Sequence, residues 1–254
     1  MNRFLNKVLC GDCLDIMQDM PDHSVDLILS DLPYGQTSHA WDKRIDLDRL
    51  WEQYKRVAKD NAAILLTAKG QFMFDLVNSN REQYRYEWIW DKDKGANFTH
   101  VRNRPLCVHE FVLVFYDRQP TYNPQMGRGR PYRQKRLQRS ITGLADNLGR
   151  FTTVSDGQRY PKSVIRVEGQ AQRDILYPTQ KPVGLFEYLI RTYSNEGDIV
   201  LDSCAGSGTT AVVCKRTMRR FIAIDLNPEA CRIAEERLST EEMTVLSYLE
   251  NNFP

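Results

Sequence analysis

An apolar run that ends in a polar hexapeptide constrains the fold of this chain more than any other feature. The run, Val25-Asp26-Leu27-Ile28-Leu29, predicts a buried strand. In the hexapeptide, Ser30-Asp31-Leu32-Pro33-Tyr34-Gly35, proline and glycine stop the strand and turn the chain outward. Ligands of parallel α/β sheets bind at the carboxyl ends of strands. The hexapeptide is therefore a candidate ligand site, although alone it is explained more simply as an aspartate–proline turn.

The residue types at this strand end suit a flat base that carries an exocyclic amine. The Asp31 carboxylate and the Leu32 carbonyl can accept the two hydrogens of such an amine. The Tyr34 ring can cover the face of the base. A second motif, far away in the sequence, favours this interpretation over the simple turn.

The second motif predicts a strand, a glycine turn and a helix over residues 199–216. Its turn, Asp202-Ser203-Cys204-Ala205-Gly206-Ser207-Gly208, lets the backbone pass close to a ligand, and the helix start offers unpaired amides. The spacing is not the dinucleotide fingerprint, which needs three glycines. A further strand over 220–225 ends on Asp225, roughly twenty residues beyond the glycines, where an acid binds ribose hydroxyls. The whole unit indicates a nucleoside-containing cofactor.

Over nearly its whole length the sequence resembles the amino-group DNA methyltransferases that use S-adenosylmethionine. It is most similar to the adenine-specific type with permuted, beta-class motif order, found in phages and mobile elements. Asp31-Leu32-Pro33-Tyr34 matches the catalytic tetrapeptide of that family, with Leu32 where a second proline is usual. Because the family uses the main-chain carbonyl at that position, this departure should be mild. The loop 202–208 matches the cofactor loop, with Cys204 in place of the usual aromatic residue.

Two further motifs carry the resemblance. Tyr177-Pro178-Thr179-Gln180-Lys181-Pro182 matches a His-Pro-Thr-Gln-Lys-Pro motif, with Tyr177 in place of the histidine. Gly11-Asp12-Cys13 matches an N-terminal element that holds the adenine of the cofactor. The resemblance implies a site-specific enzyme that transfers a methyl group from S-adenosylmethionine to the N6 amine of a flipped adenine in double-stranded DNA. Cytosine-N4 methylation and RNA or protein substrates stay open, but the family's cytosine enzymes usually carry serine where Asp31 stands.

The resemblance also assigns roles to residues. The expected catalytic residues are Asp31, Leu32, Pro33 and Tyr34. Asp12 is expected to accept a hydrogen from the cofactor's adenine amine, while Thr179 and Lys181 approach its methionine carboxylate. The full set of expected cofactor-binding residues is Asp12, Cys13, Asp31, Thr179, Lys181, Asp202, Cys204, Ala205, Gly206, Ser207, Gly208, Thr209, Asp225 and Asn227.

Alternating strand and helix patterns predict an α/β fold with a doubly wound, mostly parallel sheet. The family fold implies seven strands, one of them reversed, and an inserted basic target-recognition segment. We expect a catalytic half over residues 1–118, the insertion over 119–174, a cofactor-binding half over 175–240 and a C-terminal tail over 241–254.

The predicted insertion has a charge unlike that of the rest of the chain. Residues 118–173 carry twelve lysines and arginines against three acids, a net charge of +9, whereas the whole chain sums to +2. Such asymmetry indicates a polyanionic partner, although most charge runs are merely solvated loops. Its glycines and arginines suggest a segment that orders only on DNA. The expected DNA contacts are Arg128, Arg130, Arg133, Lys135, Arg136 and Arg139.

Other classes of protein explain less of the sequence. A nicotinamide dehydrogenase would account for the glycine turn and Asp225, but not for the tetrapeptide or the basic segment. A non-catalytic nucleic-acid-binding protein would account for the basic segment alone. The six cysteines include only one close pair, Cys10 and Cys13, so we expect reduced thiols and no metal.

Apolar runs too short for a bilayer and the absence of a signal-peptide pattern favour the cytoplasm of a bacterial or phage-infected cell. The family resemblance allows a homodimer, and the sequence does not say whether a companion restriction endonuclease exists.

Overall fold

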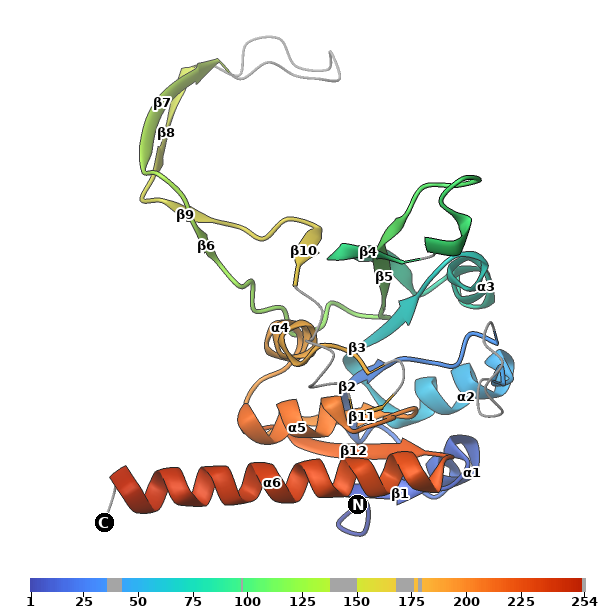
Figure 1. The fold of residues 1–254 in the computed structure, drawn as a ribbon. Coiled ribbons are helices and arrows are strands. Elements are labelled where there is room, and N and C mark those ends of the chain that lie inside the picture. Colours follow the sequence, from blue (N-terminus) through green and yellow to red (C-terminus); the bar gives the residue numbers. More distant parts are fainter. Residues whose placement is uncertain (36–42, 97, 138–149, 168–175, 178–179, 253–254) are drawn as a thin grey trace. The chain divides into compact units, whose positions relative to one another are not determined.

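The computed structural model of the chain forms two compact units (Figure 1). The first unit comprises Met1–Asn123 and Ser163–Pro254, and the second comprises Pro124–Lys162. The second unit lies inside the stretch 119–174 that the sequence marks as basic. The structure describes residues 1–35, 43–96, 98–137, 150–167, 176–177 and 180–252.

The first unit is built on one sheet of eight strands. Strand β5 is antiparallel to both of its neighbours, and every other neighbouring pair in the sheet is parallel. In sheet order the strands are β1 (Lys7–Cys10), β12 (Arg220–Asp225), β11 (Ile199–Asp202), β2 (Val25–Ser30), β3 (Ala58–Ala68), β5 (Cys107–Phe115), β4 (Tyr84–Ala96) and β10 (Val164–Arg166).

The predicted mostly parallel sheet with one reversed strand is thus confirmed, but it has eight strands rather than seven. The additional strand is β10, which pairs in parallel with β4 through Ile165 and Trp90. It falls in the stretch predicted as insertion. Three residues are too few to show the alternation of apolar and polar positions by which a strand is recognised.

Helices cover both faces of this sheet, because alternate residues of each strand point to opposite faces. Ile28 of β2 packs in one apolar cluster with residues of the first three helices, whereas its neighbours Leu27 and Leu29 pack in a second cluster with α4 and α5. The helices are α1 (Cys13–Gln18), α2 (Leu47–Val57), α3 (Gln71–Ser79), α4 (Val183–Tyr193), α5 (Thr209–Arg216) and α6 (Pro228–Asn252), with a short 3-10 helix η1 (Phe98–His100). The doubly wound prediction is therefore confirmed.

Helix α2 illustrates why these segments become helical. Its buried residues, Leu50, Trp51, Tyr54 and Val57, recur at helical spacing, and Asp46 caps its first turn by accepting from two backbone amides. At the other end of the chain, α6 extends to Asn252, so it covers most of the stretch 241–254 that we expected to be a tail. None of the helices in the described ranges is long and apolar enough to cross a membrane.

The second unit consists of two antiparallel strand pairs. Strand β6 (Gly127–Arg128) pairs with β9 (Gln158–Arg159), and β7 (Tyr132–Leu137) pairs with β8 (Arg150–Ser155). Arg159 braces the two pairs by donating to the Arg130 carbonyl at 2.6 Å and by lying over the Tyr132 ring. The segment expected to order only on DNA thus has regular strands of its own in the structure.

Candidate active site

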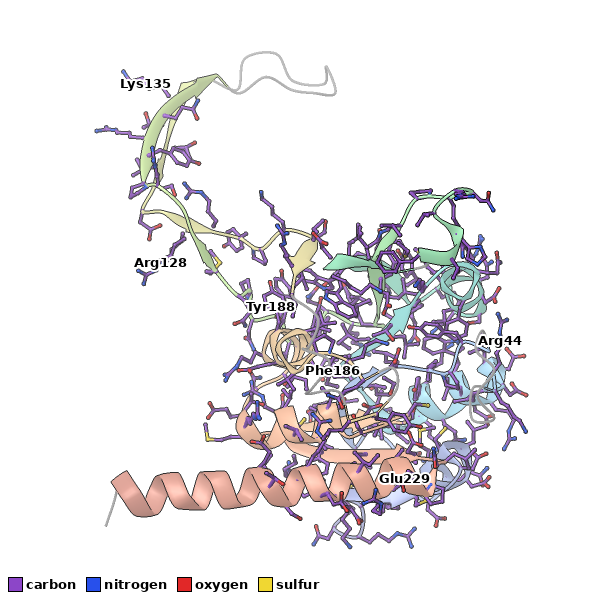
Figure 2. The ribbon with its side chains drawn as sticks, viewed as in Figure 1. Arg44, Arg128, Lys135, Phe186, Tyr188 and Glu229 are labelled. Carbon is purple, nitrogen blue, oxygen red and sulfur yellow. The ribbon has the colours of Figure 1, made fainter. Side chains whose placement is uncertain are left out.

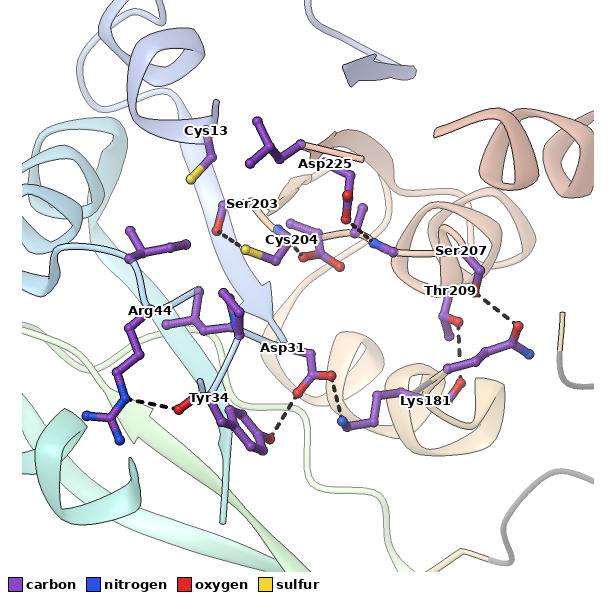
Figure 3. A pocket seen from close by; sticks show the side chains of 18 of the residues that line it. Cys13, Asp31, Tyr34, Arg44, Lys181, Ser203, Cys204, Ser207, Thr209 and Asp225 are labelled. Carbon is purple, nitrogen blue, oxygen red and sulfur yellow. Dashed lines mark hydrogen bonds and ion pairs between the residues drawn. The ribbon is translucent and has the colours of Figure 1, made fainter. Parts of the chain in front are cut away.

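The two strand-end motifs meet because their strands are neighbours. Strands β11 and β2 are parallel, with Val200 opposite Leu27 and Leu201 opposite Ile28, so both motifs leave the sheet at the same edge. A cavity of about 820 Å³ opens there (Figure 3). One part of it is lined by the glycine turn and Asp225, the other by the residues 31–34.

The structure brings most of the predicted site residues into this one cavity. The predicted residues that line it are Asp12, Cys13, Asp31, Leu32, Pro33, Tyr34, Lys181, Asp202, Cys204, Ala205, Gly206, Ser207, Thr209 and Asp225. Gly208 and Asn227 are not among the lining residues, and Thr179 lies outside the described residues.

Asp31 is held by hydrogen bonds to both of its carboxylate oxygens. Lys181 Nζ donates to Oδ2 at 2.6 Å. Tyr34 donates its hydroxyl hydrogen to Oδ1 at 3.0 Å (Figure 3). Thr67 Oγ1 donates to the same oxygen. The backbone of the turn is fixed as well, since Arg44 Nε donates to the Tyr34 carbonyl at 3.0 Å and its guanidinium pairs with Asp75. The acid therefore has a defined orientation in the cavity.

Two carboxylates share Lys181. Its Nζ lies 3.6 Å from Glu110 Oε2, and Glu110 Oε1 in turn accepts from Lys92 at 2.8 Å. Burial opposes the charge on Lys181, but Asp31 and Glu110 outweigh it and raise the pKa of Lys181 above its ordinary value. Burial likewise opposes ionisation of Glu110, yet Lys181 and Lys92 lower the pKa of its carboxyl group. The opposed shifts of Lys181 and Glu110 both favour the charged forms of these two buried groups.

Tyr34 presents its ring from the strand end. Its centroid lies 4.9 Å from that of Phe72 and 5.9 Å from Lys181 Nζ. Burial, followed by the charges of Asp31 and Glu110, raises the pKa of the Tyr34 hydroxyl well above its ordinary value. The hydroxyl is therefore a neutral donor to Asp31 at physiological pH.

The glycine turn needs its glycines for two different reasons. Gly206 and Gly208 both have positive φ, +52° and +75°. A Cβ on Gly208 would also lie 2.7 Å from Ala234 Cβ on α6, so that position combines left-handed backbone with a close helix contact. Packing against α6 therefore fixes the turn at Gly208, whose expected contact with the cofactor stays a prediction.

Asp225 at the end of β12 closes the turn from the next strand. Its Oδ2 accepts from the Gly206 amide at 2.7 Å and its Oδ1 accepts from the Asn227 amide at 2.8 Å. Asn227 also donates from Nδ2 to the Tyr177 hydroxyl at 3.1 Å. Burial raises the pKa of the Asp225 carboxyl group. Both carboxylate oxygens therefore already organise the loop, and ribose hydroxyls would share them.

Asp202 is the most deeply buried acid of the site. It accepts from the Thr210 hydroxyl at 2.5 Å and from the Cys204 amide at 3.1 Å, and burial raises its pKa to about 7. Burial and a hydrogen bond with Cys13 raise the pKa of the Cys204 thiol well above its ordinary value. Neither group is poised as a nucleophile, because a thiol with a raised pKa stays protonated.

The segment containing Gln180 and Lys181 is joined to the glycine turn by side-chain hydrogen bonds. Ser207 donates to Gln180 Oε1 at 3.0 Å, and Thr209 donates to the Lys181 carbonyl at 3.3 Å. These contacts place Lys181 Nζ on Asp31, whereas the sequence led us to expect it at the methionine carboxylate of a cofactor. At the other end of the cavity, the Asp12 carboxylate caps α1 by accepting from the Leu14 amide at 2.8 Å.

The sequence did not reveal four lining residues that come from the reversed part of the sheet or beside it. They are Lys69, Trp90, Lys92 and Glu110. The tract around Trp90 reads as strand and core, and Trp90 is indeed only 5% exposed. The missing signal was the direction of β4, which runs parallel to β3 and so ends at the same edge as Asp31.

The predicted DNA-contacting residues lie in the second unit. Arg128, Arg130, Arg133 and Lys135 are exposed, and Figure 2 shows the Arg128 and Lys135 side chains pointing away from the strands. Arg136 belongs to β7, while Arg139 lies outside the described residues.

The fold and the cavity define a mostly parallel α/β protein with a large cavity where the glycine turn and residues 31–34 meet. The sequence profile described as DNA methylase, of the N6/N4 methyltransferases, matches residues 25–236, so the chain belongs to this family. The chain is a DNA methyltransferase, and S-adenosylmethionine is its methyl donor.

Curated relatives match along most of their length. The type II methyltransferase M.HpaI of Haemophilus parainfluenzae is 28% identical over 250 residues, which cover 92% of this chain and 74% of the relative. The type II methyltransferase M.BglII of Bacillus subtilis is 27% identical over 276 residues, covering 98% of this chain and 72% of the relative.

Solved structures agree on the fold. The M1.HpyAVI–SAM complex has a TM-score of 0.66 at 22% identity and covers 91% of this chain and 98% of that one. The cytosine-N4-specific PvuII DNA methyltransferase has a TM-score of 0.65 at 15% identity and covers 91% and 85% of the two chains. At such identities the likeness concerns the fold alone.

Proposed function

We propose that this methyltransferase methylates the N6 amine of a specific adenine in DNA. The observation that carries the proposal is the Asp31 carboxylate, which lines the same cavity as the glycine turn and is fixed by three side chains. A fixed carboxylate beside the Leu32 carbonyl offers two acceptors at the strand end. An amine with two hydrogens is the complementary group.

The chemistry follows from the weakness of the amine as a nucleophile. The lone pair of an adenine amine is delocalised into the ring, and hydrogen bonds from the amine to Asp31 and the Leu32 carbonyl localise it on nitrogen. S-adenosylmethionine supplies the activated methyl group. As the new N–C bond forms, the C–S bond breaks and its electron pair stays on sulfur. The proton released from the nitrogen passes to Asp31 and then to water.

The base must leave the duplex to reach Asp31. Flipping costs a few kcal/mol, which stacking in a closed pocket offsets. Tyr34 offers its ring at the strand end, and Trp90 and Phe186 line the same cavity. No covalent enzyme intermediate is needed, so neither Cys13 nor Cys204 is required as a nucleophile.

The residues of the cofactor part fit S-adenosylmethionine. Asp12, Cys13 and Leu226 line one end of the cavity and would hold the adenine ring, and Asp225 would bind the ribose hydroxyls. Ser207 and Thr209 at the start of α5 offer donors for the methionine carboxylate, where the helix N-terminus favours an anion.

Asp225 provides the test of the cofactor site. Asp225→Ala should weaken S-adenosylmethionine binding severalfold or more, because the carboxylate both orders the Gly206 amide and faces the ribose. Isothermal calorimetry measures the change. Glu229→Ala, an exposed acid on α6, is the matched control. Unchanged affinity in a folded Asp225→Ala protein would contradict the assignment.

Cytosine-N4 methylation is the second candidate. The likeness in fold to the cytosine-N4-specific PvuII enzyme favours it, whereas Asp31 in place of serine favours adenine. Incubation with labelled S-adenosylmethionine and unmethylated DNA, followed by nucleoside analysis, separates the two. We expect label in N6-methyldeoxyadenosine, and label in N4-methyldeoxycytidine would overturn the choice of adenine.

Asp31→Ala completes the test of mechanism. Turnover should fall by at least about 100-fold, with S-adenosylmethionine affinity little changed. The exposed Asp19→Ala, whose carboxylate pairs only with Arg3 at the surface, should leave turnover intact. Near-normal turnover in Asp31→Ala would reject the role of the carboxylate.

We further propose that the second unit, Pro124–Lys162, belongs to the target-recognition region. Its exposed cations support this role, because duplex DNA is bound chiefly through its phosphates and read by a subset of contacts to base edges.

A further inference from the structure

Strands β4 and β5 extend well beyond the edge of the sheet that holds Asp31. The last residue of β3, Ala68, pairs with Phe111, and Phe111 pairs with Ile89. Beyond that level β4 continues to Ala96, which at the rise of a strand is on the order of 20 Å. Because β4 is parallel to β3 and β2, the extension projects from the carboxyl edge.

The base of this extension is part of the cavity. Trp90, Lys92 and Glu110 line the cavity wall, and the pair Lys92–Glu110 joins the two strands at 2.8 Å. Residues 98–106, which we call the hairpin tip, connect the far ends of these two strands. They are drawn as the green ribbon beyond β4 and β5 in Figure 1. The tip therefore lies beyond the catalytic edge, on the arm that carries the cavity wall.

The hairpin tip has a defined backbone. The Asn103 and Arg104 amides donate to the His100 carbonyl at 2.9 and 3.1 Å, following the turn of η1. The chain that enters the tip from β4 and the chain that leaves it towards β5 meet at Gly95 and Leu106. A Cβ on Gly95 would lie only 2.8 Å from Leu106 Cβ. A close crossing of this kind presents the tip residues in a fixed arrangement.

The side chains of the tip combine positive charge with exposed apolar surface. Phe98 is 67% exposed and Val101 is 51% exposed. Arg102 and Arg104 are exposed too, and neither forms an ion pair with any residue that the structure describes. The sequence has no acid between Lys94 and His109. This combination fits a polyanion that also offers flat apolar faces.

We propose that the hairpin tip is a second DNA-binding surface, which contacts the duplex beside the flipped base. Arg102 and Arg104 bind phosphates, and Phe98 enters the base stack next to the position that the target leaves. The inference rests on the proposed function. If a base flips into the cavity, the duplex that it leaves must lie at the carboxyl edge of the sheet, next to the hairpin tip. Apolar wedges of this kind stabilise unstacked steps in other DNA complexes.

The arginines are tested by the salt dependence of DNA affinity, which requires no methyl transfer. Removing two phosphate contacts with Arg102→Ala/Arg104→Ala should flatten the slope of log affinity against log salt by about 2. Arg118→Ala is the matched control, because Arg118 is exposed and pairs with Asp60 at the opposite edge of the sheet. Arg102→Lys/Arg104→Lys should keep the slope of the wild-type protein. An unchanged slope in the alanine variant would overturn the proposal.

Phe98 is tested by the cost of flipping. Phe98→Ala should lower turnover at subsaturating DNA by about 10-fold on a matched duplex, and less on a duplex with an abasic site opposite the target, where flipping costs less. Phe98→Trp should keep most of the turnover on both. Equal turnover of Phe98→Ala and wild type on the matched duplex, or an equal loss on both duplexes, would refute the wedge.

These readouts separate the two proposals. If the wild-type protein methylates cytosine instead of adenine, the choice of target base fails but the slopes and the abasic comparison still test the tip. If the protein methylates adenine but the alanine variant has the salt slope of the wild type, only the proposed role of the hairpin tip is refuted.

Discussion

Lys181 donates to Asp31 with Nζ 2.6 Å from Oδ2, although the two residues are 150 positions apart in the chain. The lysine side chain is 11% exposed and the aspartate side chain 20%. Since Glu110 lies on the other side of the ammonium, the charge of Lys181 is shared between an acid of the strand end and an acid of the hairpin β4–β5. The tetrapeptide and the Gln180-Lys181 segment therefore work as one unit.

Lys181→Met should lower turnover by about 100-fold, because Asp31 loses the partner that orients it and faces Glu110 without the intervening cation. S-adenosylmethionine affinity should change only a few-fold, since the ammonium contacts Asp31 rather than the start of α5. Steady-state kinetics and calorimetry separate the two effects. Lys181→Arg, which keeps the charge, should retain more turnover. A loss of cofactor affinity as large as the loss of turnover would place Lys181 at the methionine carboxylate instead.

Glu110→Gln should shift the alkaline limb of the pH–rate profile to lower pH. Asp31 and Glu110 together raise the pKa of Lys181, and removing one of these charges lowers that pKa. The ammonium is then lost at a lower pH, and Asp31 loses its donor there. Glu87→Gln, on the same strand arm but bonded to Tyr84 away from Lys181, is the control. An unshifted alkaline limb would show that the protonation of Lys181 does not limit turnover.

The Asp202→Asn variant should lose less stability than the wild-type protein as pH rises. Burial raises the pKa of Asp202 to about 7, so the folded protein favours the protonated acid. Its stabilising effect is complete below the unfolded pKa of about 4 and disappears as pH rises to about 7. Between pH 4 and pH 8 the wild-type protein should therefore lose about 2–4 kcal/mol more of its free energy of unfolding than the variant does. Denaturant titrations between pH 4 and 8 measure this, and parallel curves would contradict it.

The sequence predicted the parts of the fold that depend on local pattern. Apolar runs located all the strands of the sheet except β10, and the two strand-end motifs were expected at one edge because parallel strands end together. Asp31 and Asp202 do stand at neighbouring strand ends. The strands of the second unit were not predicted: β6 and β9 have only two residues each, and β7, Tyr-Arg-Gln-Lys-Arg-Leu, shows no alternation of apolar and polar residues.

The network around Asp31 was not predictable for a different reason. Alternation along a strand tells which face a residue occupies, but not at which end of the sheet a residue lies. Thr67 and Glu110 were therefore read as ordinary strand residues, and only the order and direction of β3, β5 and β4 bring them to the catalytic edge. The partner of Lys181 depends on that same topology.

Gly208→Ala should destabilise the protein more than Gly197→Ala. Both glycines have positive φ, +75° and +83°, so alanine is strained at each by about 1–2 kcal/mol. Only at Gly208 would the new Cβ meet a neighbour, Ala234 on α6 at 2.7 Å, which adds about 1–3 kcal/mol. The difference in stability between the two variants, measured by thermal unfolding, gives the cost of the contact with Ala234. Equal losses of stability would show that α6 moves aside without cost.

Lys135→Ala should flatten the slope of log DNA affinity against log salt by about 1, as expected for the loss of one phosphate contact. Binding to all DNA sequences should be weakened alike. If all six predicted cations contacted phosphates, the total slope would be about 5, and fewer contacts would flatten it proportionally.

The decisive comparison is the intact protein against a variant in which a short glycine–serine linker replaces residues 127–159, so that both strand pairs are removed together. Its affinity for DNA should fall and its slope should flatten by more than that of Lys135→Ala, while S-adenosylmethionine affinity stays unchanged. Lys55→Ala, an exposed cation on α2, serves as the point-charge control. Equal affinity and slope with and without the second unit would show that its cations are only solvated. The hairpin tip 98–106 would then be the surface that binds the duplex.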